Sequence, residues 1–132
     1  MGRPINVLID TDIGTDIDDA IALVLAAKSG AVRLAGVTTV SGNAVMRAKI
    51  ATHLLRLCGY AQIPVAAGAG GTCSDAPCQF FPDKMLHYCV GADAVSLILE
   101  KARELDNLMI ITLGPLTNIA SCMKKDPVTM QK

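Results

Sequence analysis

The stretch INVLIDTDIGTDIDDAIALVLAAK, residues 5–28, determines the fold class. Residues 5–9 form a short apolar run that ends at once in carboxylates, which is typical of a buried strand. Residues 18–28 are rich in Ala and Leu, open with two acids and close with Lys28. This charge order suits a helix, whose amino end is positive and whose carboxyl end is negative. The stretch therefore predicts a strand followed by a helix.

The same alternation continues along the chain. Aliphatic and β-branched runs predict further strands, and Ala- and Leu-rich segments bounded by Asn, Gly or Pro predict further helices. The expected strands are residues 5–9, 32–40, 63–67 and 108–113, and the expected helices are residues 18–28, 44–58, 92–105 and 115–124. This pattern indicates an α/β fold with an open, mainly parallel, Rossmann-like sheet and helices on both faces.

Two segments interrupt this pattern. Residues 68–90 contain Gly, Pro, Cys and Phe without a clear period, which predicts a long loop of the kind that binds ligands or covers sites. Residues 126–132 show no element of their own and look like an unfinished tail. With 132 residues, the chain is long enough for one domain around one sizeable core.

The composition excludes several classes of protein. The 12 Lys and Arg residues balance the 12 Asp and Glu residues, so no excess positive charge favours binding to nucleic acid or to an anionic membrane. No apolar run is long enough for a membrane span, and residues 1–9 do not resemble a secretory signal. The five cysteines show no CxxC spacing, so we expect reduced thiols in a cytoplasmic protein.

An acidic cluster follows the first expected strand. Its five carboxylates fall within ten residues: Asp10, Asp12, Asp16, Asp18 and Asp19. Like charges crowded at a sheet edge repel one another unless a cation lies between them, and a hard divalent ion with oxygen ligands relieves that repulsion. The cluster therefore predicts a divalent metal site. The alternative is that Asp16 or Asp18 only caps the helix while the others are solvated.

Polar groups also follow two other expected strands. Asn43 comes after the strand of residues 32–40, where it either caps the next helix or offers its amide to a polyol. Leu113 precedes the Gly114-Pro115 turn, which leaves its backbone carbonyl free to ligate a metal. Thr117 and Asn118 are as readily explained as packing and turn residues. In parallel sheets, ligands bind beyond the carboxyl ends of the strands, so these groups and the acidic cluster belong to one predicted crevice.

Three segments together carry a family resemblance. DTDIGTDIDDAIAL, TTVSGN and LGPLTNIA, in that order and at those strand ends, resemble the inosine–uridine-preferring nucleoside hydrolases. The resemblance covers nearly the whole chain and is least clear over residues 68–90. It implies an open α/β sheet, a tightly held Ca²⁺ ion and hydrolysis of the N-glycosidic bond of ribonucleosides. Residues 1–132 are then the N-terminal part of one nucleoside hydrolase-like domain, with an incomplete form of that fold.

The resemblance also implies the metal ligands. Asp12 is similar to the calcium-bound general base that takes a proton from the attacking water. Asp19 is similar to a bidentate calcium ligand, and Asp10 to a supporting carboxylate near the ion. The backbone carbonyl of Leu113 corresponds to a further ligand. The longer spacing from Asp12 to the Asp18-Asp19 pair matches the DxDIGxDIDD variant of the family.

Two further residues correspond to substrate contacts. Asp18 is similar to the residue that binds the ribose hydroxyls, and Asn43 to another ribose contact. Together with Asp12, they imply a site whose substrate is a ribonucleoside. Cleavage of the ribosyl–base bond passes through an oxocarbenium-like state, and an ion that holds the diol and a water molecule lowers the pKa of that water.

The chain is much shorter than members of the family. The part without a counterpart here normally supplies a His near the leaving base, a further Asp ligand and additional base contacts. We therefore expect a fragment or a truncated relative that binds calcium weakly, turns over little and associates as a homo-oligomer through exposed apolar surface. His87 in the long loop is a weak candidate for a base contact, and His53 is expected on a helix face.

Other functions remain open at this stage. One is a catalytically inactive half-domain that binds a metal, a nucleoside or a partner. Another is a magnesium phosphatase of the haloacid dehalogenase type, which also uses an Asp-x-Asp after a strand, but that motif does not call for Gly14 or for the Asp18-Asp19 pair. An EF-hand is excluded because the twelfth position from Asp10 is Ile21, not Glu.

Overall fold

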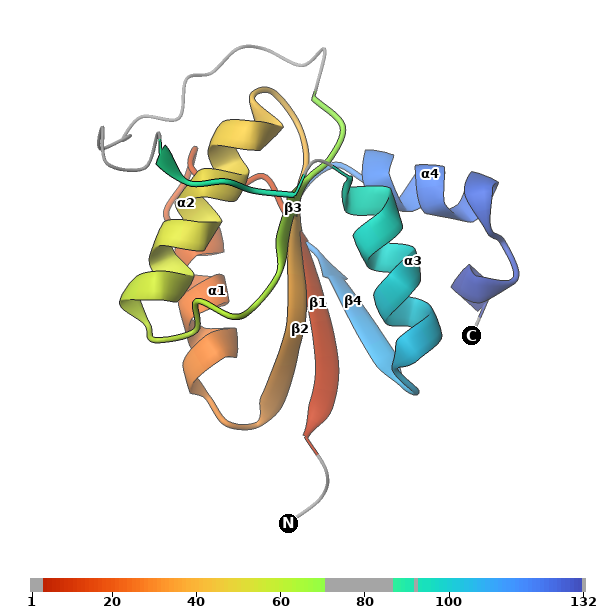
Figure 1. Ribbon diagram of the computed structural model, residues 1–132, viewed down its shortest axis with the longest axis horizontal. Coiled ribbons are helices and arrows are strands. Elements are labelled where there is room, and N and C mark those ends of the chain that lie inside the picture. The colour runs from red at the N-terminus through yellow and green to blue at the C-terminus, as the bar shows by residue number, and fades with distance from the viewer. Residues whose placement is uncertain (1–3, 71–86, 92, 132) are drawn as a thin grey trace.

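The computed structural model describes residues 4–70, 87–91 and 93–131. Within them a four-stranded sheet is covered by helices on both faces (Figure 1). The strands are β1 (Ile5–Thr11), β2 (Val32–Thr39), β3 (Val65–Ala67) and β4 (Leu108–Thr112). The helices are α1 (Asp18–Lys28), α2 (Ala44–Leu57), α3 (Ala94–Glu104), α4 (Thr117–Lys125) and the 3₁₀-helix η2 (Thr129–Gln131). The predicted α/β class is confirmed.

The strand order β3-β2-β1-β4 determines where the predicted site lies in the fold. All the neighbouring strands are parallel, and β1 lies between β2 and β4. The chain runs outward from β1 to β3 and then returns to the other side of β1 as β4. The order therefore reverses between β1 and β4, and the crevice beyond their carboxyl ends is where such folds bind ligands.

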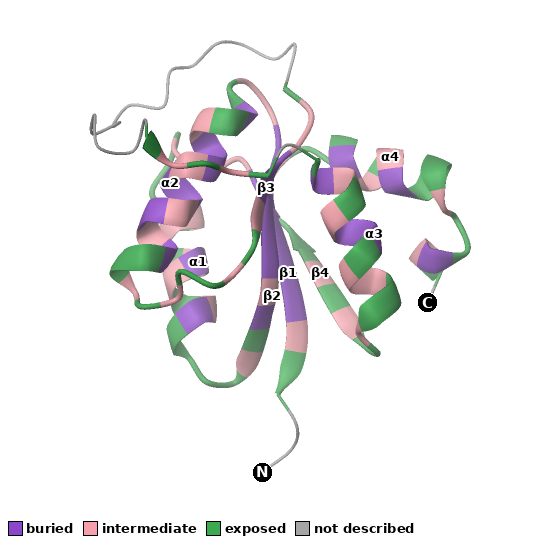
Figure 2. Cartoon of the chain, viewed as in Figure 1, coloured by how far each residue is buried: buried purple, intermediate pink, exposed green. Residues whose placement is uncertain are grey.

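Apolar side chains of β1 alternate between two cores. Val7 and Ile9 pack with Leu23 of α1 and Leu55 of α2 on one face of the sheet. On the other face, Leu8 packs with α3 and α4 through a second cluster, whose other buried members are Ile98, Leu99 and Cys122. Figure 2 shows the burial concentrated in β1 and β2 and on the helix surfaces that face the sheet. A strand buried on both faces is typical of the centre of a parallel sheet.

Several predicted boundaries differ from the structure. The first strand does not end at residue 9, because Asp10 and Thr11 pair with Thr38 and Thr39 of β2 and are buried. Six other helices and strands shift by one or two residues at their ends. Of the predicted loop, residues 68–90, only 68–70 and 87–90 are described.

The tail contains the 3₁₀-helix η2, which was not predicted. Asp126 accepts hydrogen bonds from the backbone N and the hydroxyl of Thr129, at 3.0 and 2.7 Å. Its carboxylate also pairs with Arg103 of α3 at 2.6 Å. These bonds stabilise η2, which packs against α3. The ion pair could not be predicted from local pattern, because Arg103 is 23 positions away from Asp126. Within the described residues, none of the helices has the length and apolar character needed to cross a membrane.

Candidate functional site

Asp10 is a buried carboxylate at the end of β1. Its Oδ1 accepts hydrogen bonds from Thr38 Oγ1 at 2.6 Å and from Asn118 Nδ2 at 2.9 Å. Its Oδ2 is also buried but has no hydrogen-bond partner among the described residues. Burial raises the pKa of Asp10, and the nearby charge of Asp12 raises it further, although the two hydrogen bonds act in the opposite direction. The unpartnered oxygen therefore favours either a proton or a cation.

Asp19 is tied to the end of the same strand. Thr11 Oγ1 donates a 2.5 Å hydrogen bond to Asp19 Oδ2, and the same hydroxyl oxygen accepts from the backbone N of Ile13 at 3.0 Å. Burial raises the pKa of Asp19, and the charges of Asp12 and Asp18 add to the effect. The first turn of α1 thus brings a second perturbed carboxylate to the end of β1.

Four of the predicted residues line one hollow. A cavity of about 220 Å³ lies at the carboxyl end of β1 and is lined by Asp12, Thr15, Asp16, Asp18, Asp19 and Leu113. Leu113 reaches it because its backbone N donates to the Asp10 carbonyl at 2.8 Å, which continues the pairing of β4 with β1. Gly114 allows this approach, since a Cβ there would lie 2.9 Å from Val40 and 3.0 Å from the Asp12 nitrogen.

Asn43 caps helix α2. Its Oδ1 accepts a hydrogen bond from the backbone N of Met46 at 3.0 Å. Asn43 does not line the cavity described above. The sequence left two interpretations of Asn43 open, and the structure shows the helix cap. The cap uses the amide oxygen of Asn43 and leaves the amide nitrogen for other contacts.

Sequence reasoning missed Arg47, which joins two loops of the site. This buried side chain donates from Nη1 to the carbonyls of Asp12 and Ile13 and to Thr15 Oγ1, and from Nε to the Ser41 carbonyl at 3.0 Å. Arg47 holds the backbone that carries Asp12. The only local signal was a cation in the first turns of a helix, where the dipole disfavours it.

Asn118 is a second residue whose role was missed. It is 1% exposed. Its Nδ2 donates to Asp10 Oδ1 and, at 3.0 Å, to the Thr39 carbonyl, while its Oδ1 accepts from Ala69 N at 3.0 Å. One amide thus connects α4 with the ends of β1 and β2 and with the segment after β3. Its sequence context was compatible with a simple turn residue.

The residues present supply the oxygen chemistry that Ca²⁺ prefers. Four carboxylates and Leu113 line the cavity, and the buried Oδ2 of Asp10 has no hydrogen-bond partner among the described residues. However, within residues 4–70, 87–91 and 93–131, no three His, Cys, Asp or Glu side chains are gathered closely enough to hold a metal ion. The donor set therefore fits a hard cation without forming a closed ligand shell.

Comparisons with known proteins point to one family. Residues 7–132 match the family model of the inosine-uridine preferring nucleoside hydrolases. The chain is 34% identical to a probable uridine nucleosidase of Oryza sativa, over 91% of this chain and 40% of the relative. It is 36% identical to a pyrimidine-specific ribonucleoside hydrolase of Photobacterium profundum, over 91% of this chain and 42% of the relative.

The solved structures agree with the sequence comparison. A plant nucleoside hydrolase superposes with a TM-score of 0.76 at 31% identity, over 98% of this chain and 46% of that one. The chain therefore spans less than half the length of the relatives that it matches.

Substitution of Gly68 tests the role of Asn118. A Cβ at Gly68 would lie 2.3–2.6 Å from the Asn118 amide, so Gly68→Ala should displace that side chain and break its hydrogen bonds. We expect the free energy of unfolding, measured by urea denaturation, to fall by about 2–4 kcal/mol. Gly36→Ala is the matched control, because its Cβ would meet nothing closer than 3.6 Å. Equal effects of the two substitutions would contradict this account.

The raised pKa of Asp10 predicts a pH dependence. Its ordinary value of 3.8 applies to the unfolded chain, and the folded value is higher. Without a divalent ion, the free energy of unfolding should therefore fall as the pH rises from 3.8 through the raised pKa of the folded state. Asp10→Asn removes this titration but keeps an oxygen that can accept from Thr38 and Asn118. Its unfolding free energy should vary less between pH 4 and pH 7, and a slope equal to that of the parent would contradict the assignment.

Proposed function

Since the chain belongs to the inosine-uridine preferring nucleoside hydrolase family, we propose that it hydrolyses the N-glycosidic bond of ribonucleosides to free base and ribose. The observation that carries the proposal is the shared cavity at the carboxyl end of β1. There Asp12, Asp18, Asp19 and the Leu113 segment lie around one hollow, although Leu113 is far away in sequence.

The carboxylates around the cavity take different roles in the proposal. Asp12 accepts the proton of the attacking water, because it lies on the cavity wall and Arg47 holds its backbone in place. Asp18, exposed at the start of α1, accepts hydrogen bonds from the ribose hydroxyls. Asn43 contacts ribose through its amide nitrogen, since the oxygen caps α2. A general base typically contributes a factor of about 10²–10⁴ to the rate.

We propose Ca²⁺ as the cofactor, held by Asp10, Asp12, Asp19 and the carbonyl of Leu113, with the three carboxylates drawing closer together around the ion than they lie without it. When bound, it would orient the ribose diol beside a water molecule and lower the pKa of that water. The chain's own part is to bring these oxygens to one end of the sheet despite their mutual repulsion. The unpartnered Oδ2 of Asp10 and the raised pKa of Asp19 support this role, since both groups gain from a nearby positive charge.

A second candidate is a half-domain that binds a metal or a nucleoside without turnover. It is favoured by the open ligand set within the described residues. The phosphatase reading loses its support, because the family match accounts for the Asp-x-Asp motif. Cytoplasmic location and homo-oligomerisation stay predictions.

Asp12→Asn tests the proposed general base. Ribose release from inosine and from uridine should fall by about 10²–10⁴-fold, while the circular dichroism spectrum stays unchanged. Asp106→Asn is the control, because Asp106 is exposed at the opposite end of β4. Activity of Asp12→Asn within a few-fold of the parent would refute the role. A parent chain that binds Ca²⁺ and inosine but releases no ribose would favour the second candidate.

Asp19→Ala tests the proposed metal site. Titration calorimetry with CaCl₂ should show an affinity at least tenfold weaker than that of the parent, because a ligand carboxylate is lost. A chelator should remove any hydrolysis by the parent, and added Ca²⁺ should restore it. Asp106→Asn again serves as the control. An unchanged calcium titration for Asp19→Ala would count against Asp19 as a ligand.

A further inference from the structure

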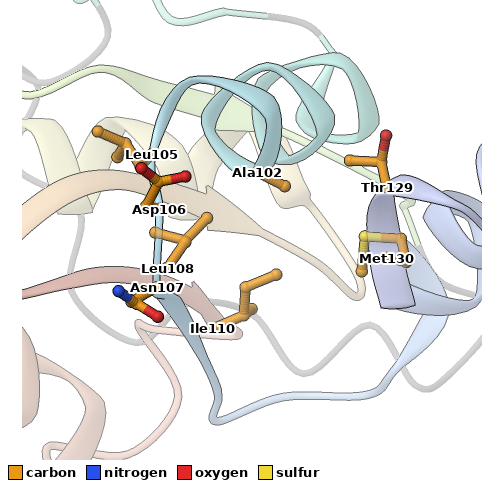
Figure 3. Close-up of a pocket in the computed structure, with 8 residues that line it drawn as sticks. All are labelled: Ala102, Leu105, Asp106, Asn107, Leu108, Ile110, Thr129 and Met130. Atoms are coloured by element: carbon orange, nitrogen blue, oxygen red, sulfur yellow. The ribbon is translucent and has the colours of Figure 1, made fainter. Parts of the chain in front are cut away.

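Charge, rather than size, distinguishes the candidate site from a larger hollow beside β4. That hollow, a groove of about 490 Å³ between β4, α3 and η2, has Asp106 as the one charged residue among the described residues that line it (Figure 3). The cavity of the candidate site is smaller, about 220 Å³, but four of its six lining residues are carboxylates. Like charges at this density repel one another, so the loop that carries them keeps one arrangement only if another part of the chain fixes it.

Arg47 is a buried cation next to this acidic loop. It is 4% exposed, and none of the ion pairs among the described residues includes it. Its guanidinium donates instead to neutral oxygens, which are three backbone carbonyls and one hydroxyl. These acceptors compensate for the removal of the charge from water. The charge of Arg47 therefore holds backbone in place and does not neutralise one particular carboxylate.

The two turns that Arg47 joins have unusual backbone conformations. The turn after β1 contains Gly14 at φ 109°, and Arg47 donates to the carbonyls of the two residues before this Gly and, at 3.0 Å, to the hydroxyl of Thr15 after it. The turn after β2 contains Ser41 at φ 73°, which residues with a Cβ rarely adopt, and Arg47 Nε donates to its carbonyl at 3.0 Å. One side chain thus holds both turns.

A guanidinium suits this set of acceptors better than an ammonium group. Its planar fork carries five N–H donors in fixed directions, whereas Lys has a single nitrogen on a flexible stem. In Arg47, Nη1 binds the turn after β1 and Nε binds the turn after β2, so the fork sets how the two turns lie relative to each other. The backbone N of Arg47 also donates to the Asn43 carbonyl at 3.1 Å, which fixes the origin of the fork beside Asn43.

We propose that Arg47 is a positioning residue, which fixes Asp12 and Asn43 relative to one another before any cation or nucleoside binds. This inference rests on the function proposed above, in which Asp12 is the general base and a Ca²⁺ ligand and Asn43 contacts ribose. A cation that meets an ordered turn loses less of its binding free energy to ordering of the chain. Arg47 therefore favours Ca²⁺ binding, although its own charge repels the ion.

This opposition separates two roles of the buried charge. If Arg47 affected Ca²⁺ only through its charge, removal of the charge would tighten Ca²⁺ binding. If Arg47 positions the turns, its replacement weakens Ca²⁺ binding even though a repelling charge is lost. Arg47→Met removes the charge and keeps an unbranched stem, and Arg47→Lys keeps the charge but loses the fork. Loss of affinity in both variants is the signature of positioning.

Hydrogen exchange without Ca²⁺ or nucleoside tests the positioning directly. The amides of Ile13 and Ser41 lie in the two turns, and both are hydrogen-bonded in the structure. In both Arg47 variants these amides should exchange at least tenfold faster than in the parent, beyond any change at Leu8 in the centre of β1, whose exchange follows global unfolding. Thermal melting verifies that each variant is folded at the temperature of the measurement.

Titration calorimetry with CaCl₂ supplies the second readout. Both Arg47 variants should bind Ca²⁺ at least fivefold more weakly than the parent, because part of the binding free energy is then spent on ordering the turns. Arg33→Lys and Arg33→Met are the matched controls, since Arg33 is exposed at the start of β2, at the opposite end of the sheet from the cavity. They should match the parent in both measurements.

Each outcome decides on the proposal. Unchanged exchange at Ile13 and Ser41 overturns it, and so does Ca²⁺ binding by Arg47→Met that is unchanged or tighter. If neither Arg47 variant folds, Thr15→Val, which removes one acceptor at an exposed position, should speed exchange at Ile13 at least threefold, and an unchanged rate there overturns the proposal. A parent chain that binds no Ca²⁺ contradicts the proposed cofactor, and the exchange measurement then decides on Arg47 alone.

Discussion

The buried carboxylate of Asp10 is the constraint on which the site depends. Taking an ionised carboxylate out of water is costly unless hydrogen bonds or a positive charge compensate for it. Here two donors, from β2 and α4, approach one oxygen, and the other oxygen has no partner among the described residues. Thr38 and Asn118 therefore hold the end of β1 in place. Their hydrogen bonds compensate for the burial of only one of the two carboxylate oxygens of Asp10. This imbalance is what makes the strand end a place for a proton or a cation.

The loops around Asp10 are positioned by contacts between distant parts of the chain. Arg47 joins the loop after β1 to the loop after β2. Asn118 joins α4 to both strand ends and to Ala69. Gly68 and Gly114 allow these approaches, since a side chain at either position would collide with its neighbours. The carboxylates thus lie on a preorganised backbone, which is the arrangement that favours catalysis by positioning.

The candidate site and the open edge of the sheet are neighbours. The strand order reverses between β1 and β4, so the cavity lies where those two strands end. β4 is also the strand with apolar residues exposed on its outer face.

The sequence by itself determined the layered α/β fold, most of the strands and helices, and the family. These follow from periodicity, capping and short motifs, all of which act over a few residues. Only the tertiary structure decided that Asp10 is buried, that Arg47 and Asn118 hold the loops, and that Asp126 orders the tail. Apart from the local bonds to Ser41 and Thr129, the partners of these groups lie 23 to 108 positions away. Local sequence patterns carry no information about such pairs, because these contacts form only when the strands are assembled in their order in the sheet.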